Sequence, residues 1–145
     1  MSGTLPPTVR LSRAAHEAIR AEAALSYPNE GCGALLGGGP GDVREAMPLA
    51  NEEATSPRTR FTVAPRDYLV AEEAADARGL ALLGFWHSHP DHPARPSATD
   101  RQFAWPGLLT LVIAVECGEP QEITAWDVPE VDLPFRRLSL SIVPD

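Results

Sequence analysis

The chain has 145 residues and a mass of 15.6 kDa, which suits one domain, and we expect residues 1–145 to form it. Hydrophobic residues make up 43% of the sequence and charged residues 22%, which is typical of a folded globular protein rather than a disordered one. The net charge is −8, and all twelve basic residues are arginines, scattered except for the pair Arg136 and Arg137. This distribution argues against nucleic acid and anionic membranes as partners.

The cysteines and the N-terminus indicate a reducing compartment. Cys32 and Cys117 stand far apart in the sequence and are too few for a disulfide framework. The first residues contain no basic stretch followed by an apolar run, and no apolar segment is long enough to cross a bilayer. We therefore expect a cytoplasmic protein.

The first half of the chain is predicted to contain two helices and a hairpin. After a Pro-rich lead, Ser12 is placed to cap a helix whose apolar residues follow helical spacing to about Ser26, where Tyr27 and Pro28 end it. A short apolar run between glycines predicts a buried strand, and the glycines after it predict a turn into a second strand. The predicted ranges are 31–36 for the first strand, 37–41 for the turn, 43–49 for the second strand, 51–60 for a loop and 65–78 for the second helix.

The second half of the chain is predicted to consist mainly of strands. Residues 80–89 alternate so that His87 and His89 share one face, and because both faces are largely apolar we expect this strand to be central. A proline-rich loop and a short helix that begins at Ser97 follow it. The remaining predicted ranges are 91–96 for the loop, 97–105 for the helix, and 108–115, 122–128 and 138–143 for three further strands.

Candidate metal ligands lie at the end of the predicted central strand. His87 and His89 are two positions apart, so both side chains point to the same side of the strand and can converge on one ion. The loop that follows reverses the chain and brings Asp100 back toward the strand end as an oxygen ligand. Two histidines, one carboxylate and an open fourth position are typical of catalytic zinc, whereas structural zinc sites are usually closed by cysteines, which do not cluster here.

Two further residues are candidates for the chemistry of hydrolysis. A hydrolytic zinc site needs a base that takes a proton from the attacking water and delivers it to the leaving amine. Glu30 is the best candidate, because it directly precedes the buried strand and a carboxylate at such a strand end can reach the metal site. Ser97 is placed to donate a hydrogen bond to the oxyanion that forms when water adds to a carbonyl.

Each of these residues also has a simpler interpretation. A His-x-His pair often arises by chance, Ser97 and Asp100 alone are a helix cap, and Glu30 alone would be an exposed loop acid. Cys32 is a candidate nucleophile with one of the two histidines as its base, but that pairing would use up a metal ligand, and a small buried residue is the favoured interpretation. Together, the residues favour a metal-dependent hydrolase.

The combined pattern resembles the motif of the JAMM, or MPN-plus (Mov34/Pad1-type), zinc metalloproteases. In that family an upstream Glu is followed by His-x-His-Pro and, after six residues, by Ser-x-x-Asp. The segments 27–33 and 84–90 are also similar to prokaryotic members, and the resemblance extends over most of the chain. The motif positions are occupied here by Glu30, His87, His89, Pro90, Ser97 and Asp100, with six residues between Pro90 and Ser97.

The resemblance implies a fold, a cofactor and a set of roles. The implied fold is α/β (α+β), the cytidine-deaminase-like JAMM fold, with a curved mixed β-sheet flanked by helices. The implied cofactor is one Zn²⁺ per chain, with His87, His89 and Asp100 as its ligands. Glu30 would be the general acid/base for a zinc-activated water, and Ser97 would be the oxyanion donor.

The resemblance also implies a class of substrate. Family members hydrolyse an isopeptide or peptide bond next to the C-terminal Gly-Gly of a ubiquitin-like protein, and the bacterial relatives of ubiquitin are sulphur carriers of the ThiS and MoaD type. The motif does not distinguish processing of a carrier, its release from protein lysines, or removal of an attached cysteine. Family members often pair, so a homodimer is compatible with the resemblance, and the roles of Cys32 and His92 stay open.

The main alternative within the same fold is a non-catalytic binding scaffold. Such scaffolds usually lack the ligands or the base, and this chain keeps all of them. A hydrolase centred on Cys32 is the second alternative. The sequence therefore favours a zinc-dependent peptidase.

Overall fold

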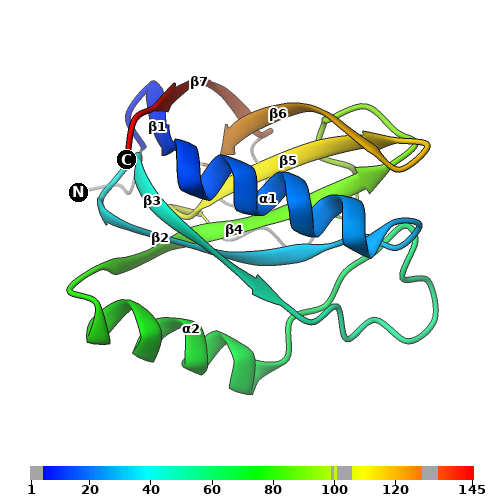
Figure 1. Ribbon diagram of the computed structural model, residues 1–145, viewed down its shortest axis with the longest axis horizontal. Coiled ribbons are helices and arrows are strands. Elements are labelled where there is room, and N and C mark those ends of the chain that lie inside the picture. The colour runs from blue at the N-terminus through cyan, green and yellow to red at the C-terminus, as the bar shows by residue number, and fades with distance from the viewer. Residues whose placement is uncertain (1–4, 99, 101–105, 129–133) are drawn as a thin grey trace.

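A computed structural model of the protein describes residues 5–98, 100, 106–128 and 134–145. Within these residues the chain forms seven strands and two helices, and Figure 1 shows α1 lying across the strands with α2 beside them. In chain order the elements are β1 (Thr8–Ser12), α1 (Arg13–Ser26), β2 (Cys32–Gly39), β3 (Asp42–Leu49), α2 (Pro65–Ala77), β4 (Ala81–Pro90), β5 (Leu109–Glu116), β6 (Glu119–Asp127) and β7 (Arg136–Val143).

The strands form one mixed sheet whose two ends meet. The strand order is β1-β3-β2-β4-β5-β6-β7, and β1 pairs with both β3 and β7, so that the sheet closes into a barrel. The pairs β1/β3, β1/β7 and β4/β5 are parallel, and the other pairs are antiparallel. The curved mixed sheet with flanking helices that the sequence predicts is confirmed, and its curvature is large enough to join the first strand to the last.

β4 is the central strand on which the two histidines lie. It pairs antiparallel with β2 and parallel with β5, which confirms the prediction that this strand is central. Gly84 permits the close approach of β5, because a Cβ atom there would lie 1.9 Å from the carbonyl oxygen of Leu109. Because neighbours bond it on both sides, β4 holds the backbone of His87 and His89 firmly in place.

α1 covers the inner face of the sheet. Ser12 caps this helix, as predicted, by accepting a hydrogen bond from the backbone N–H of Ala15 at 3.1 Å. The buried side chains of α1 recur at helical spacing and pack into the main hydrophobic core with Trp86 and the inward-facing residues of β5. These buried residues of α1 are Ala15, Ile19 and Ala23.

α2 packs on the other face, against β2 and β4. It begins at Pro65, and Gly79 follows its end with a φ of +67°, a left-handed conformation that glycine adopts without strain. Its buried residues Ala71 and Ala75 belong to a second hydrophobic cluster that includes residues of β2. The predicted second helix is therefore present, and it buries its alanines against the sheet.

The alternation of side chains along β4 decides on which face the candidate site lies. Trp86 enters the inner core, whereas Phe85 belongs to the outer cluster under α2. His87 and His89 lie two and four positions after Phe85 in the same strand, so their side chains share its face, the outer one. The prediction that the two histidines share one face is confirmed by their contact, described below.

Two local predictions are wrong. The Pro-rich lead contains a strand, β1, in which Val9 and Leu11 are buried; its partner β7 lies at the other end of the chain, so the short pattern alone did not reveal it. The glycine turn begins later than predicted, because Gly37 still pairs with Val43 and β2 continues to Gly39. The other predicted strands and both long helices are present, with ends shifted by a few residues.

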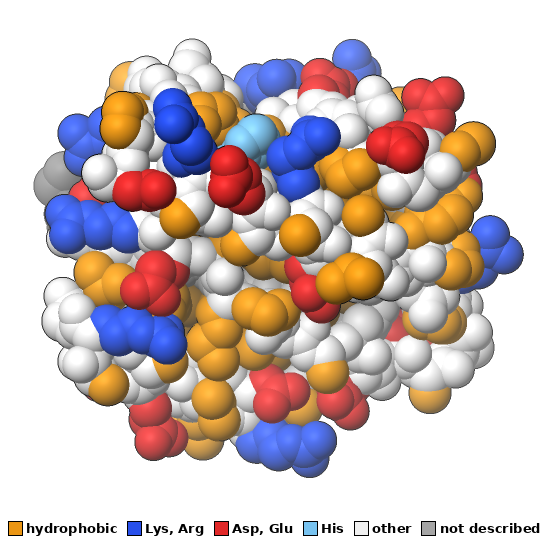
Figure 2. All heavy atoms as spheres, viewed as in Figure 1, with side chains coloured by type: hydrophobic (Ala, Val, Ile, Leu, Met, Phe, Trp, Pro, Cys, Tyr) orange, Lys and Arg blue, Asp and Glu red, His pale blue; other side chains and the backbone are white. Residues whose placement is uncertain are grey.

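The predicted helix over 97–105 falls largely outside the described residues. In the part of the chain that the structure describes, no helix is both long and apolar enough to span a membrane. On the face shown in Figure 2, acidic and basic side chains are interspersed, with hydrophobic side chains between them. The charge on this face is therefore mixed in sign.

Candidate active site

The two histidines of β4 bring their ring nitrogens together on the outer face. Nε2 of His87 and Nε2 of His89 are 3.2 Å apart, and both side chains are buried. Neighbouring strands flank them, because Cys32 of β2 is the register partner of His87 and Ala114 of β5 is that of His89. β4 therefore presents two imidazoles at a fixed spacing, as the His-x-His pattern predicts.

Asp100 completes a triangle of donor atoms with the two histidines. Its Oδ2 atom lies 3.0 Å from Nε2 of His87 and 2.9 Å from Nε2 of His89. Among the described residues, these three side chains are placed closely enough to share one metal ion. Donors about 2.0–2.2 Å from a tetrahedral ion lie roughly 3.3–3.6 Å apart, so the triangle is only a few tenths of an ångström tighter than that geometry and its donor set fits zinc.

Ser97 holds Asp100 in place through a reciprocal pair of hydrogen bonds. The backbone N–H of Ser97 donates to Oδ2 of Asp100 at 2.7 Å, and the backbone N–H of Asp100 donates to Oγ of Ser97 at 3.0 Å. The predicted cap is thus confirmed. The Ser97 hydroxyl acts only as an acceptor in this pair, so its exposed side chain keeps a hydrogen to donate elsewhere.

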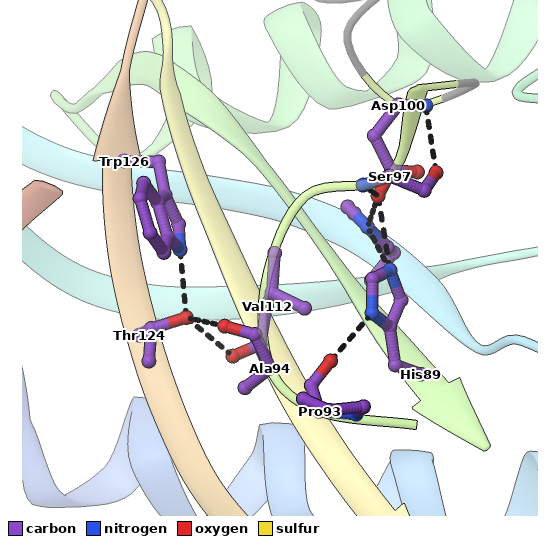
Figure 3. A network of polar contacts seen from close by, with 9 residues as sticks. His89, Pro93, Ala94, Ser97, Asp100, Val112, Thr124 and Trp126 are labelled. Atoms are coloured by element: carbon purple, nitrogen blue, oxygen red, sulfur yellow. Dashed lines mark hydrogen bonds and ion pairs between the residues drawn. The ribbon is translucent and has the colours of Figure 1, made fainter. Parts of the chain in front are cut away.

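A backbone carbonyl fixes the orientation of His89. The carbonyl oxygen of Pro93 can only accept, so Nδ1 of His89, which lies 2.9 Å away, carries the hydrogen and donates it. Nε2 of the same ring is then the atom that faces Asp100 and can bind a metal ion. Figure 3 shows the ring held between the Pro93 carbonyl on one side and Asp100 on the other.

Thr124 braces the segment that carries this carbonyl. Its Oγ1 donates to the carbonyl oxygen of Ala94 at 2.6 Å and accepts a hydrogen bond from Nε1 of Trp126 at 2.7 Å (Figure 3). The Thr124 side chain is almost completely buried, so water does not compete for these bonds. A chain of hydrogen bonds therefore links β6 to the loop that orients His89.

The loop between β3 and α2 shapes another side of the site. Phe61 stacks on His87, with ring centroids 4.7 Å apart and an interplanar angle of 22°. Nδ2 of Asn51 donates to the carbonyl oxygens of Glu30 and Arg60, at 3.0 Å in both cases. One side-chain amide thus ties the residue before Phe61 to the backbone of Glu30.

Glu30 is a buried acid, which excludes the simpler interpretation of an exposed loop residue. It is only 4% exposed, and its Oε1 atom has no hydrogen-bond partner among the described residues. Burial, followed by the negative charge of Asp100, raises the pKa of its carboxyl to about 8. The carboxyl can therefore exchange a proton near neutral pH, which is what a general acid/base requires.

The hydrogen bonds within the triangle favour the ionised form of Asp100. Burial acts to raise the pKa of Asp100, but hydrogen bonds from His87 and His89 outweigh burial and bring the pKa below the usual aspartate range. Burial also acts to lower the pKa of His89, and the hydrogen bonds to Asp100 and Pro93 outweigh it and raise the pKa. The site therefore combines a fixed negative charge at Asp100 with an acid, Glu30, that titrates near neutral pH.

Cys32 is a buried thiol with little tendency to ionise. It is 1% exposed, and its Sγ lies 3.7 Å from the carbonyl oxygen of Leu49 and 3.8 Å from that of Ala50. Burial, followed by the charge of Glu30, raises the pKa of the thiol to about 12, which suppresses the thiolate form that a nucleophile needs. His92 is exposed and is not part of the triangle.

Three residues that shape the site were not singled out by the sequence: Asn51, Phe61 and Thr124. Asn51 and Thr124 donate hydrogen bonds to backbone carbonyls. Every residue type has such a carbonyl, so the sequence does not reveal these partners. Phe61 had one available signal, since a single aromatic residue in a polar loop is unusual and suggests a contact elsewhere in the fold.

Comparison with known proteins places the chain in a family. Residues 12–129 match the prokaryotic homologs of the JAB domain. The chain belongs to this family. The desampylase of Haloferax volcanii is 36% identical to this JAB domain over 127 residues, which cover 85% of each chain. A probable TtuB-protein conjugate cleaving protease of Thermus thermophilus is 39% identical over 84 residues, which cover 58% of this chain and 55% of the relative.

Solved structures share the fold of this JAB domain. The solution structure of DSY2949 from Desulfitobacterium hafniense has a TM-score of 0.82 and 32% identity, and the match covers 94% of both chains. The crystal structure of AF2198, a JAB1/MPN domain protein from Archaeoglobus fulgidus, has a TM-score of 0.59 and 18% identity, covering 94% of this chain and 100% of that one. The prediction of a prokaryotic JAMM domain is confirmed.

Replacing Thr124 by Val is expected to weaken the binding of Zn²⁺ by roughly 10- to 100-fold. Valine keeps the shape of threonine but removes the hydroxyl that donates to Ala94, so the loop that orients His89 loses its brace. The measurement is a competition titration with a chromophoric chelator. Thr124→Ser keeps the hydroxyl and is expected to bind nearly as well as the wild type. Wild-type affinity in a folded Thr124→Val protein would rule out this bracing role.

The raised pKa of Glu30 makes the stability of the metal-free protein dependent on pH. Because the pKa rises from 4.5 to about 8 on folding, the folded state binds more protons than the unfolded state between these values. The free energy of unfolding therefore falls as the pH rises from about 4.5 to 8. In Glu30→Gln this decrease is expected to be smaller than in the wild type by on the order of 4 kcal/mol. Urea denaturation at pH 5 and pH 8 in the presence of a chelator measures it.

Glu17→Gln is the control for this experiment, because Glu17 is exposed on α1. Its curve of stability against pH is expected to run parallel to that of the wild type. A Glu30→Gln curve that is also parallel to the wild-type curve would show that Glu30 ionises normally in the folded protein.

Proposed function

We propose that this JAB domain is a zinc-dependent isopeptidase or peptidase that cleaves after the C-terminal Gly-Gly of ubiquitin-like or sulphur-carrier proteins. The observation that carries the proposal is the cluster of His87, His89 and Asp100. Glu30 is a buried acid that interacts electrostatically with Asp100 and His89, and its Oε1 lacks a partner among the described residues. The names of two relatives support the substrate class, since one is a desampylase and the other a probable protease that cleaves TtuB-protein conjugates.

Three residues would hold one Zn²⁺ per chain. His87 and His89 would each offer Nε2, and Asp100 would offer a carboxylate oxygen. Three protein donors of this kind are typical of catalytic rather than structural zinc. When bound, zinc polarises the substrate carbonyl and makes water more acidic.

Glu30 would carry the proton. Its pKa is about 8, and a cation bound nearby would lower that pKa and favour the carboxylate form. The carboxylate can accept a proton from the attacking water. The same group would then return the proton to the leaving amine. The backbone of Glu30 is held on both sides for this task, because its carbonyl accepts from Asn51 and its N–H donates to Pro57 at 2.7 Å.

Ser97 would donate its hydroxyl hydrogen to the oxyanion. Its Oγ already accepts the backbone N–H of Asp100, which restricts the directions in which the hydroxyl can point. Water attacks the carbonyl directly in this scheme, so no covalent bond forms between enzyme and substrate. The high pKa of Cys32 agrees with a reaction that does not use a thiolate.

The buried acid also favours an enzyme over a non-catalytic scaffold. An unpaired polar atom in the interior lowers stability, and a binding scaffold gains nothing from retaining one at Glu30. We further propose a single catalytic domain over residues 1–145 and a cytoplasmic location. Two free cysteines, Cys32 and Cys117, support that location because a reducing compartment keeps them as thiols.

Glu30→Gln is expected to lower kcat/KM by roughly 10²- to 10⁴-fold while the protein keeps its zinc, because the amide has the shape of the carboxyl but cannot accept a proton. The assay uses each ubiquitin-like carrier encoded in the same genome, either extended beyond Gly-Gly or joined to a lysine of an acceptor protein. Mass spectrometry identifies the cleaved bond, and elemental analysis gives the zinc content.

Cys32→Ala is the control, since alanine fits the same buried position in β2, and its rate is expected to equal that of the wild type. Cleavage that persists in Glu30→Gln, or that a chelator does not stop, would overturn the proposed mechanism. Zinc-loaded wild type that binds the carriers but cleaves none of them would establish the scaffold instead.

A further inference from the structure

A cavity of about 370 Å³ opens beside Ser97. Its lining consists of Arg95, Pro96, Ser97, Ala98, Trp126 and Phe135. A larger cavity, of about 660 Å³, lies between α1 and the strands β6 and β7, but none of the five candidate site residues lines it. The smaller cavity shares Ser97 with the site, so a substrate bound for cleavage can reach it.

The walls of this cavity are aromatic and held in place. Trp126 and Phe135 pack edge to face, with ring centroids 6.4 Å apart and an interplanar angle of 80°. Nε1 of Trp126 donates to Thr124, so the indole is fixed by a hydrogen bond as well as by packing. Both aromatic side chains are only half-buried, which leaves apolar surface available to a ligand.

The cavity is close to the reacting atoms. Ser97, which lines it, exchanges two hydrogen bonds with the ligand residue Asp100, at 2.7 and 3.0 Å. Figure 3 shows the segment from Pro93 to Ser97 between Trp126 and His89, so one short segment carries residues of the cavity lining at one end and the carbonyl that orients His89 at the other. A group that enters the cavity therefore lies near the bond that would be cleaved.

We infer that this cavity binds the side chain of the residue that directly follows the scissile bond, on the leaving-group side. The inference rests on the proposed function. A tail that ends in Gly-Gly carries no side chain at the two positions before the bond, and an extended chain advances about 3.3–3.6 Å per residue, so the first carrier side chain lies roughly 7 Å upstream. Ser97 acts at the scissile carbonyl itself, and the nearest side chain to it belongs to the leaving group.

The chemistry of the lining selects the kind of side chain. Two aromatic rings favour an aromatic or aliphatic group, which gains by leaving water. Arg95 is exposed beside the cavity, and the guanidinium carbon of Arg137 lies 5.3 Å from the centroid of the Trp126 ring. These positive charges disfavour a basic side chain in the same place.

The test uses a carrier that the wild type cleaves, extended after Gly-Gly by X-Ala-Ser, with Phe, Leu, Ala or Arg at X. Wild-type kcat/KM is expected to be about tenfold higher for Phe and Leu than for Ala, and lower for Arg than for Ala. Phe135→Ala is expected to remove most of the preference for Phe, so that the ratio of kcat/KM on the Phe substrate to kcat/KM on the Ala substrate falls from about ten to about two or less.

Ile142→Ala is the matched control, because it removes an exposed apolar side chain that lines the larger cavity, and it is expected to change none of the four rates. Phe135→Leu preserves an apolar wall, and it is expected to lose the preference for Phe but to keep the preference for Leu. This variant provides the test if Phe135→Ala folds poorly. Equal wild-type rates on all four substrates, or a uniform loss across them in both Phe135 variants, would overturn the inference. The proposed function would survive either result, because cleavage of the Ala substrate reports on it separately.

Discussion

One carboxylate oxygen, Oδ2 of Asp100, holds the candidate site together. It lies 3.0 Å from Nε2 of His87 and 2.9 Å from Nε2 of His89, and it accepts a hydrogen bond from the backbone N–H of Ser97 at 2.7 Å. Because the oxygen is buried, water screens its charge poorly, and the neighbouring groups respond to it. The charge contributes to the raised pKa of His89 and of Glu30, so an acid suited to proton transfer exists here partly because Asp100 is ionised.

The positions of these groups depend on strands more than on loops. β4 pairs with β2 as far as His87 and with β5 from Gly84 to Pro90, which fixes the two histidines. The loops that supply the other groups are tied back to that framework. Thr124 ties down the loop before Ser97, and Asn51 joins the backbone of Glu30 to the loop that carries Phe61. The lining of the cavity beside Ser97 includes Trp126, which donates a hydrogen bond to the same Thr124, so one buried hydroxyl supports both the loop beside His89 and a wall of the cavity.

The parts of this arrangement that the sequence predicts are those set by spacing within one element. Alternation along a strand places His87 and His89 together, and helix capping links Ser97 to Asp100, so both pairs could be predicted without knowledge of the fold. The closing strand β1 could not, because its partner β7 lies at the other end of the chain. The burial of Glu30 also depends on distant segments, which is why Glu30 alone looked like an exposed loop acid.

The supporting residues were hidden for a related reason. Asn51 and Thr124 bind carbonyl oxygens of the main chain, and any residue type can supply such an oxygen. Their role therefore follows from the tertiary structure and from no local pattern. The resemblance to JAMM metalloproteases implied which residues are candidates for the reaction, and the structure adds the residues that hold these candidates in position.

The central claim is that one metal ion binds among His87, His89 and Asp100. X-ray diffraction data collected on both sides of the zinc absorption edge, from crystals of the zinc-loaded protein, test it most directly. We expect one anomalous peak per chain, about 2.0–2.2 Å from Nε2 of each histidine and from a carboxylate oxygen of Asp100. A peak coordinated by other residues, such as His92 or Cys117, or the lack of any peak at the triangle, would contradict the account.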